Sequence, residues 1–344
     1  MPWNNGLQPN VTVLNGEAPP QRGSGNGLAA LTALLRCKEA SALVILIALC
    51  IFLAIVDKSF LSERSLTLVA RQMSFVGVAS LGAMLVLSCG QLDLSVGSCM
   101  GIGGVLAAHC TVNLHMGDAA ALIIALAAGA MYGAFNGALV VGLRLNSLIA
   151  TLGTGLMGRG AIYAITNSMP INGFSRGLRY LGVGYLWGLP TPVWILSALA
   201  AVATFVMART KFGWHIYAIG GNEEAARLSG VRVDRLKFIS FTIAGLLAAL
   251  GGVLLTARLG SGEVSVGTGY ELDVIAAAVI GGLRFGVGSA GVSPIGMLLG
   301  VAVMSVMRSA LSLLDIPSAF QPIVLGCAIL MAMGLERVRS ARQQ

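Results

Sequence analysis

The chain has 344 residues, of which 56% are hydrophobic and 10% are charged, and its mean hydropathy is +0.85. Ordinary soluble domains carry about a quarter charged residues, so this composition excludes a soluble globular protein. The net charge of +8 does not indicate a nucleic-acid-binding surface, because no Lys or Arg occurs between Arg71 and Arg144 and the others gather at the ends of apolar segments. Apolar segments near twenty residues recur along the chain, and each is long enough to cross a bilayer. We therefore predict an all-α, polytopic membrane protein.

The N-terminal residues 1–39 are rich in Gly, Pro, Asn and Gln, which predicts a disordered tail. They do not resemble a secretory signal, because the polar stretch is too long and the apolar stretch after it nearly spans a bilayer. We expect this first apolar segment to remain in the membrane. A transmembrane domain is predicted over 40–337, followed by a short tail at 338–344.

Ten apolar segments are candidate membrane spans, some of them short or broken. Segment 271–283 is too short to cross unaided, and a broken or re-entrant helix buried against other helices is the alternative for it. The ten candidates are 40–56, 68–87, 95–112, 119–142, 148–167, 192–208, 238–258, 271–283, 293–311 and 320–336. Starting inside, this order puts both termini, the turns near Asp93, Arg144 and Arg284, and the polar segment 209–237 on one side of the membrane. Most Lys and Arg residues outside the spans fall on that side, which the positive-inside rule assigns to the cytosol.

Glycines recur at helical spacing in two of these spans. Gly129, Gly133 and Gly137 repeat every four residues, as do Gly296 and Gly300. Residues four apart lie on one face of a helix, and small residues there let a neighbouring backbone approach closely. We interpret both sets as helix-packing surfaces and not as ligand sites.

Segment 209–237 is the longest polar stretch of the transmembrane domain. After Gly220-Gly221, Asn222 is a suitable N-cap, two glutamates follow in the first turn, and Gly230 is placed to end a short helix. A short helix displayed at a membrane face is typical of a docking element; a solvated connector that contacts nothing is the alternative. The predicted docking residues are Gly220, Gly221, Asn222, Glu223, Glu224, Ala225, Ala226 and Arg227.

Polar residues inside or beside the spans are candidates for a translocation pathway, because burying them in a bilayer is costly. As a set they suit a cargo that is polar but uncharged, and no span carries the series of ionisable groups typical of a proton relay. For any single residue a structural role is favoured: Asp93 also suits a turn or cap, and Glu271 and Asp273 also suit the dipole of a helix that they open. The candidates are Asp93, Asn136, Thr151, Thr154, Arg159, Glu271 and Asp273, with Arg308 as a further intramembrane charge.

Motifs for catalysis and cofactor binding are absent from the sequence. There is no GxxxxGK[ST] loop, nucleophile elbow, HExxH pair or dinucleotide fingerprint, and the six cysteines and three histidines show no metal-ligand spacing. We therefore predict a chain that is not an enzyme and that binds no cofactor or metal itself. If ATP drives transport, a separate subunit must hydrolyse it. A channel or secondary transporter that works alone is the alternative.

Five blocks follow one another in the sequence: GQLDLSVGS (90–98), NGALVVGLR (136–144), IATLGTGLMGRG (149–160), FGWHIYAIGGNEEAARLSGVRV (212–233) and GTGYELDVIAAAVIGG (267–282). They are the most specific pieces of a resemblance, over roughly residues 40–337, to the permease subunits of bacterial ATP-binding-cassette importers for ribose, other monosaccharides and autoinducer-2.

The resemblance implies about ten helices in the bacterial inner membrane and a pathway formed by two permease subunits, either two copies or a paralogous pair. It also implies partner ATPase subunits that use ATP and Mg²⁺, a periplasmic solute-binding protein and a sugar as cargo. The block from Gly220 to Arg227 resembles the segment that couples such a permease to its ATPase. Departures from the family pattern at 146–148, 283–285 and 309–312 leave the identity of the sugar open, and branched-chain amino acids remain an alternative cargo.

Overall fold

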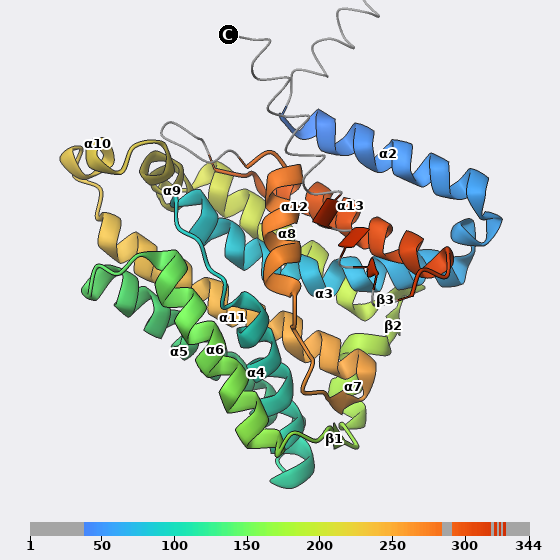
Figure 1. Cartoon of the computed structure of the whole chain (residues 1–344). Helices are drawn as coiled ribbons and strands as arrows, with labels where there is room; N and C mark the ends of the chain where they lie inside the picture. The colour runs from blue at the N-terminus through green and yellow to red at the C-terminus, as the bar shows by residue number, and fades with distance from the viewer. Residues whose placement is uncertain (1–37, 284–290, 318–319, 322, 325, 328–344) are drawn as a thin grey trace, which may run out of the picture. The chain divides into compact units, whose positions relative to one another are not determined.

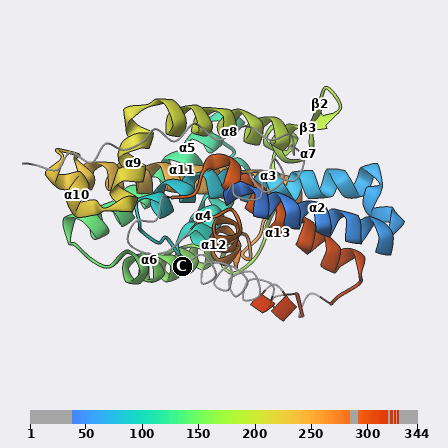
Figure 2. The ribbon, with the colours of Figure 1, turned by 90° about the horizontal axis from the view of Figure 1, so that it is seen from above.

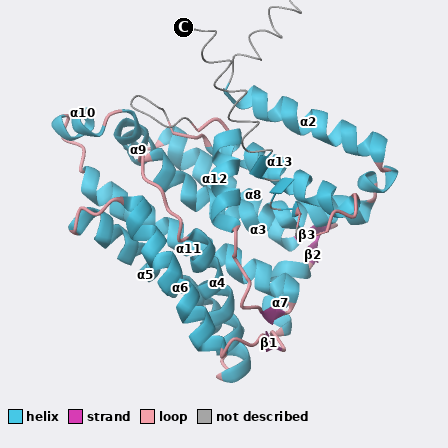
Figure 3. Ribbon diagram, viewed as in Figure 1, coloured by secondary structure: helices cyan, strands magenta, loops and turns pink. Residues whose placement is uncertain are grey.

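The computed structural model describes residues 38–283 and 291–317, together with 320, 321, 323, 324, 326 and 327. The predicted turn at Arg284, the C-terminal tail, nearly all of the N-terminal tail and much of span 320–336 lie outside the described residues. The described part is almost entirely helical (Figure 3), which confirms the all-α prediction.

Twelve α-helices form the described part of the chain (Figure 1). They are α2 (Lys38–Val56), α3 (Glu63–Ser88), α4 (Val96–Ala108), α5 (Asp118–Gly137), α6 (Ser147–Thr166), α7 (Arg176–Val183), α8 (Thr191–Arg209), α9 (Lys211–Gly221), α10 (Glu223–Leu228), α11 (Val233–Leu259), α12 (Tyr270–Ile280) and α13 (Pro294–Leu313). A 3-10 turn, η1 (Lys58–Leu61), follows α2, and the π-helical turns η2 (His109–Asn113) and η3 (Ala138–Gly142) extend α4 and α5.

Two antiparallel pairs of very short strands connect helices. β1 (Ile171–Asn172) pairs with β4 (Ser261–Gly262), and β2 (Tyr185–Leu186) pairs with β3 (Leu189–Pro190). The first pair joins the segment after α6 to the segment after α11. The second pair is a hairpin directly before α8.

Seven helices among the described residues are long and apolar enough to cross a membrane: α3, α4 with η2, α5 with η3, α6, α8, α11 and α13. Two further predicted spans coincide with shorter apolar helices, the part Ala40–Val56 of α2 and the 11-residue α12. Among the described residues, the helices named above therefore coincide with nine of the ten predicted segments, and most of the tenth, 320–336, lies outside the described part. Most of α12 is buried, from Asp273 to Val279 with one interruption, as expected for a short element packed inside the bundle.

The central helix of the bundle is α11, which packs against α3, α4 and α5 (Figures 1 and 2). Its 27 residues extend over about 40 Å, more than the hydrocarbon thickness of a bilayer. The two ends of α11 therefore reach opposite faces of the membrane.

Glycines make the contact between α11 and α5. A Cβ added at Gly133 would collide with the backbone carbonyl of Phe241, and one added at Gly245 with the backbone of Gly129 and Gly133. The predicted packing role of this glycine set is thus confirmed, because the two backbones meet where no side chain fits. The second predicted set, Gly296 and Gly300, has the same role in the contact of α13 with α12, since a Cβ at Gly300 would meet the carbonyl of Ala277.

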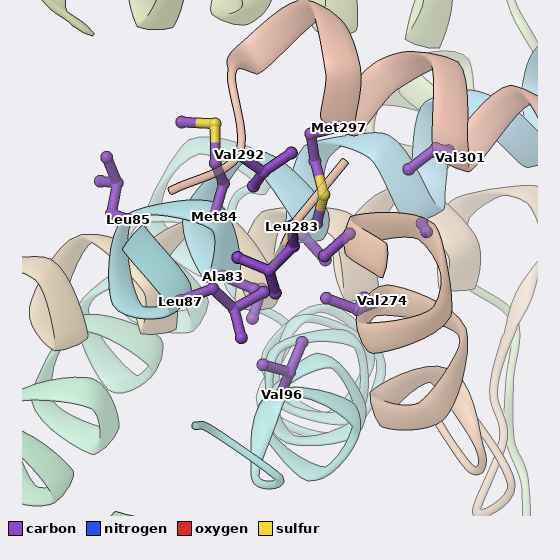
Figure 4. Packing of buried hydrophobic residues seen from close by; sticks show 14 of the residues in the cluster. Ala83, Met84, Leu85, Leu87, Val96, Val274, Leu283, Val292, Met297 and Val301 are labelled. Atoms are coloured by element: carbon purple, nitrogen blue, oxygen red, sulfur yellow. The ribbon is translucent and has the colours of Figure 1, made fainter. Parts of the chain in front are cut away.

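An apolar core joins α3, α4, α12 and α13 (Figure 4). This cluster of buried side chains contains Met84 and Leu87 of α3, Val96 of α4, Val274 of α12 and Met297 of α13. The short α12 is thereby fixed between longer helices. Its N-terminal polar residues are placed at one edge of the core.

We predict that Gly133→Val destabilises the protein by about 1–3 kcal/mol, because overpacking forces apart two backbones in contact. The matched control is Gly153→Val in α6, where an added Cβ meets nothing within 4 Å. The measurement is the thermal unfolding midpoint of the purified protein in detergent. Equal midpoints for the two variants would contradict the close contact of α5 with α11.

Candidate functional site

Segment 209–237, predicted as a loop with one short helix, is helical over most of its length. The short helix is present as α10: the side chain of Asn222 accepts a hydrogen bond from the Ala225 N–H (2.9 Å), and Gly230, at φ +84°, follows its end. The prediction missed α9, which runs through Gly220 and Gly221. These glycines lie in its last turn, and burial of Ile216 and Ile219 on one face stabilises the helix despite them.

Ion pairs attach α10 to the beginning of α11. Lys237 Nζ lies 2.7 Å from Glu223 Oε2, and Arg227 Nη2 lies 2.8 Å from Asp234 Oδ1 and 3.5 Å from Glu223 Oε1. Because Arg227 donates hydrogen bonds to Asp234, the pKa of its guanidinium is raised above its usual value. Lys237 is buried, so its pair with Glu223 is less screened by water than the others. The short helix is therefore tied to the central helix.

These contacts divide the predicted docking residues into two groups. Glu223 and Arg227 are engaged within the chain, and Ala226 is buried in the core beneath α10. The expectation that Ala226 offers surface to a partner is therefore wrong, because its side chain faces inward. The α10 surface, as it is called below, comprises the exposed residues of α10 and its cap that the ion pairs above do not hold: Asn222, Glu224, Ala225 and Leu228. Arg227 is exposed as well but is paired with Asp234. Leu228, which is 84% exposed, is the most prominent apolar group of the α10 surface.

A second polar cluster holds the turn before α4. Asp93 Oδ1 accepts hydrogen bonds from the N–H and the hydroxyl of Ser95 (2.8 and 2.6 Å), and the amide of Asn136 donates to the same hydroxyl (2.7 Å). The Thr151 hydroxyl accepts from the Leu94 N–H (3.0 Å). These groups join α5 and α6 to the start of α4, which favours the structural interpretation of Asp93 and Thr151.

Thr154 belongs to the same region and is also satisfied within the protein. Its hydroxyl donates to the carbonyl of Thr151 (3.2 Å), and its own carbonyl accepts a hydrogen bond from the Tyr132 hydroxyl (2.5 Å). Within this cluster the one buried side-chain atom without a partner among the described residues is Asn136 Oδ1. The cluster therefore offers little hydrogen-bonding capacity to a solute.

Arg159 and Glu271 form a second place where buried polar atoms lack partners, and here the atoms belong to charged side chains. Arg159 Nη1 donates to the carbonyl of Val266 (2.7 Å), but its Nη2 and the Oε2 of Glu271 are buried without partners in the described part of the chain. Both side chains lie over the glycine face of α4: a Cβ at Gly97 would collide with Glu271, and one at Gly101 would lie 3.4 Å from Arg159 Nη1. Buried polar atoms without partners are costly, so this position is a candidate for hydrogen bonds to a bound solute.

Asp273, by contrast, is paired. Its carboxylate binds Arg308 at 2.5 Å, and the Arg308 guanidinium lies 5.8 Å from the ring centre of Tyr270. Gln72 connects Tyr270 to Arg258, by accepting from Arg258 Nη1 and donating to the Tyr270 hydroxyl, both at 3.2 Å. The network links α12 and α13 to α3 and α11.

Sequence reasoning missed Gln72, Tyr270 and Arg258 as members of this network. A polar Gln72 next to Arg71 within an apolar span was an available signal. The partner of that side chain depends on how α3 and α12 are placed side by side, which periodicity does not give. No group of three or more His, Cys, Asp or Glu residues in the described part of the chain has the arrangement of a metal site.

Residues 65–333 match the family described as branched-chain amino acid transport system / permease component. The chain belongs to this permease family. Membership, with the seven apolar helices, makes it a multi-pass membrane protein and a transport subunit. No solved structure matches the permease significantly.

Curated relatives of the permease include two ribose import permease proteins and one xylose transport system permease protein. The ribose import permease protein of Escherichia coli (strain K12) is 38% identical to this chain over 295 residues, which cover 84% of this chain and 91% of the relative. The ribose import permease protein of Bacillus subtilis (strain 168) is 37% identical over 296 residues, which cover 85% of this chain and 91% of the relative. The xylose transport system permease protein of Escherichia coli (strain K12) is 32% identical over 388 residues, which cover 94% of this chain and 97% of the relative.

We predict that Asp273→Ala destabilises the permease by about 3 kcal/mol, because a partly buried Arg308 is left without its counter-ion. The double variant Asp273→Leu with Arg308→Met removes both charges and should recover most of the loss. The thermal unfolding midpoint in detergent is measured for the single and the double variant. An unchanged midpoint for Asp273→Ala would show that the pair contributes nothing to the contact of α12 with α13.

Proposed function

We propose that the chain is the membrane permease of an ATP-driven importer that takes up a sugar or sugar-like solute across the bacterial inner membrane. The named functions of the ribose and xylose relatives support the cargo class. The observation that carries the mechanism is α10, a short capped helix with an exposed apolar residue that is ion-paired to the central helix.

In this proposal the α10 surface docks into a groove on an ATPase subunit that binds ATP and Mg²⁺. Leu228 would fill the groove, Ala225 would permit close approach, and Glu224 would supply a polar contact. Glu223 and Arg227 act as positioning residues, because their side chains are already held by Lys237 and Asp234. Movement of the ATPase would then displace the first turns of α11.

The proposed orientation puts α10 and both termini in the cytosol. The ends of helices on the α10 side carry Arg209, Lys211, Arg232 and Arg235, which agrees with the positive-inside rule. The opposite face, where α11 ends at Leu259, would receive the solute from a periplasmic binding protein. A second permease subunit, either a copy or a paralogue, would complete the pathway.

For the solute-facing part of the pathway we propose Arg159 and Glu271. One unpaired donor and one unpaired acceptor over the glycine face of α4 suit the hydroxyl groups of a neutral sugar, which both donate and accept hydrogen bonds. Asp93, Thr151, Thr154 and Asp273 would support the helices around this position.

A branched-chain amino acid is a second candidate cargo, because the family description names it. An amino acid brings two charged groups and an apolar side chain, whereas a sugar brings several hydroxyls. Binding of radiolabelled ribose, xylose and leucine to the partner binding protein distinguishes them. A self-sufficient channel or secondary transporter would instead move solute in liposomes that contain this chain without an ATPase.

We predict that Leu228→Asp abolishes co-purification with the ATPase and ATP-dependent uptake, because a charge replaces the exposed apolar residue of α10. The level of the variant in the membrane should be unchanged, since this side chain is 84% exposed. The matched control is Leu114→Asp, an exposed leucine between α4 and α5 and away from α10. Normal uptake by Leu228→Asp would remove α10 from the coupling role.

We predict that Glu271→Gln raises the solute concentration for half-maximal uptake about tenfold, because a hydrogen bond to a charged group contributes about 1.5–3 kcal/mol. Glu263→Gln is the matched control, since that carboxylate already accepts a hydrogen bond from the Ser261 hydroxyl at 2.6 Å. Uptake by reconstituted transporter, normalised to ATP hydrolysis, is the measurement. Identical concentration dependence for both variants would exclude Glu271 from the pathway.

A further inference from the structure

The β2–β3 hairpin exposes an unusual apolar tip at the end of the bundle opposite α10. Residues 185–189 are all exposed, and four of the five have large aromatic or aliphatic side chains: Tyr185, Leu186, Trp187 and Leu189. The two turn residues, Trp187 at φ +50° and Gly188 at φ +79°, have the left-handed backbone of a two-residue hairpin turn. A bulky residue is rarely found in this conformation. A tryptophan held there and 84% exposed indicates a role outside the fold.

The hairpin is fixed to the bundle and does not merely project from it. The Trp194 indole N–H donates to the carbonyl of Leu186 (3.0 Å), and the Tyr180 hydroxyl donates to the carbonyl of Tyr185 (2.8 Å). The Arg71 guanidinium lies 4.9 Å from the ring centre of Tyr185. The exposed side chains are thus presented by a rigid support.

The exposed tip is continuous with one face of α8. The ring of Trp187 meets that of Trp194 edge to face, with centroids 5.6 Å apart. Trp194 opens a stripe that continues through Ala198, Val202 and Phe205 at three- to four-residue spacing, all exposed. An exposed apolar stripe along a membrane-spanning helix faces lipid or another membrane helix.

The length of α8 gives the depth of the hairpin. Its 19 residues extend over about 28 Å, close to the hydrocarbon thickness of about 30 Å. The hairpin directly precedes Thr191, the first residue of α8. It therefore lies at the level where hydrocarbon gives way to headgroups, the level at which Trp and Tyr are enriched in membrane proteins.

We propose that the β2–β3 hairpin is a lipid-binding element that inserts into the headgroup region of the bilayer at the face opposite α10. The ring of Trp187 contacts the upper acyl chains, and its N–H, which has no partner among the described residues, donates to lipid ester or phosphate oxygens. Exposed Arg176 and Arg179 on the preceding α7 provide positive charge for the phosphates. Residues 180–190 themselves carry no charged side chain, as suits a lipid surface better than a water-borne protein partner.

The test uses the full chain in phosphatidylcholine vesicles whose lipids are brominated either near the headgroup or near the chain end. Bromine quenches tryptophan on contact, so the difference between the intact chain and Trp187→Phe isolates the emission of Trp187. We expect about twofold stronger quenching of this fraction by the shallow label than by the deep one, as for aromatic residues at the interface. Trp214→Phe, at an exposed tryptophan of α9, is the matched control.

Two results would overturn the proposal. In the first, neither label quenches the Trp187 fraction, which places the hairpin in water. In the second, Trp187 escapes both lipids and its emission shifts only when the solute-binding protein is added, which makes the tip a protein contact. Because Trp187 is exposed, the phenylalanine variant should keep the unfolding midpoint of the intact chain, and this is checked in parallel.

Discussion

The ion pair between Glu223 and buried Lys237 is the contact on which the proposed coupling depends, because it joins a helix with an exposed face to the helix at the centre of the bundle. A short helix of six residues has little stability of its own. Its Asn222 cap and its ionic attachment to α11 give it a defined position. In the proposed coupling, a force applied to the exposed side of α10 would be transmitted to α11 through this attachment.

The packing of α11 determines how far such a force reaches. Glycine contacts bring its backbone against α5, and further contacts join it to α3 and α4. Closely packed surfaces of this kind move as units or change between discrete arrangements, since they do not deform continuously. At the far end of α11, Arg258 meets Gln72 and, through it, Tyr270 of α12. The described helices thus connect the α10 surface with the polar residues at the other face.

Much of this arrangement follows from local sequence. Apolar segments of bilayer length, the Asn222 cap and the four-residue glycine spacing each depend on neighbours along the chain. They predict nine helices, α10 and a close helix contact at the glycines of α5, but not that α11 is the partner. Burial of Ala226 and the pairing of Asp273 with Arg308 depend on which helices lie side by side, and periodicity alone does not determine that. The sequence analysis therefore placed Ala226 on a docking surface and Asp273 among the pathway candidates. The continuation of α9 through Gly220 and Gly221 was missed because tertiary packing outweighs glycine propensity there.

The most direct test of the coupling is an exchange of charges between α10 and α11 in the assembled transporter, with solute uptake measured per ATP hydrolysed. Glu223→Lys and Lys237→Glu each break the attachment and should lower this ratio severalfold, since like charges then face each other at close range. The double exchange restores an opposite pair and should recover most of the ratio. Undiminished coupling in both single variants would show that α10 acts without its attachment to α11 and would contradict the account.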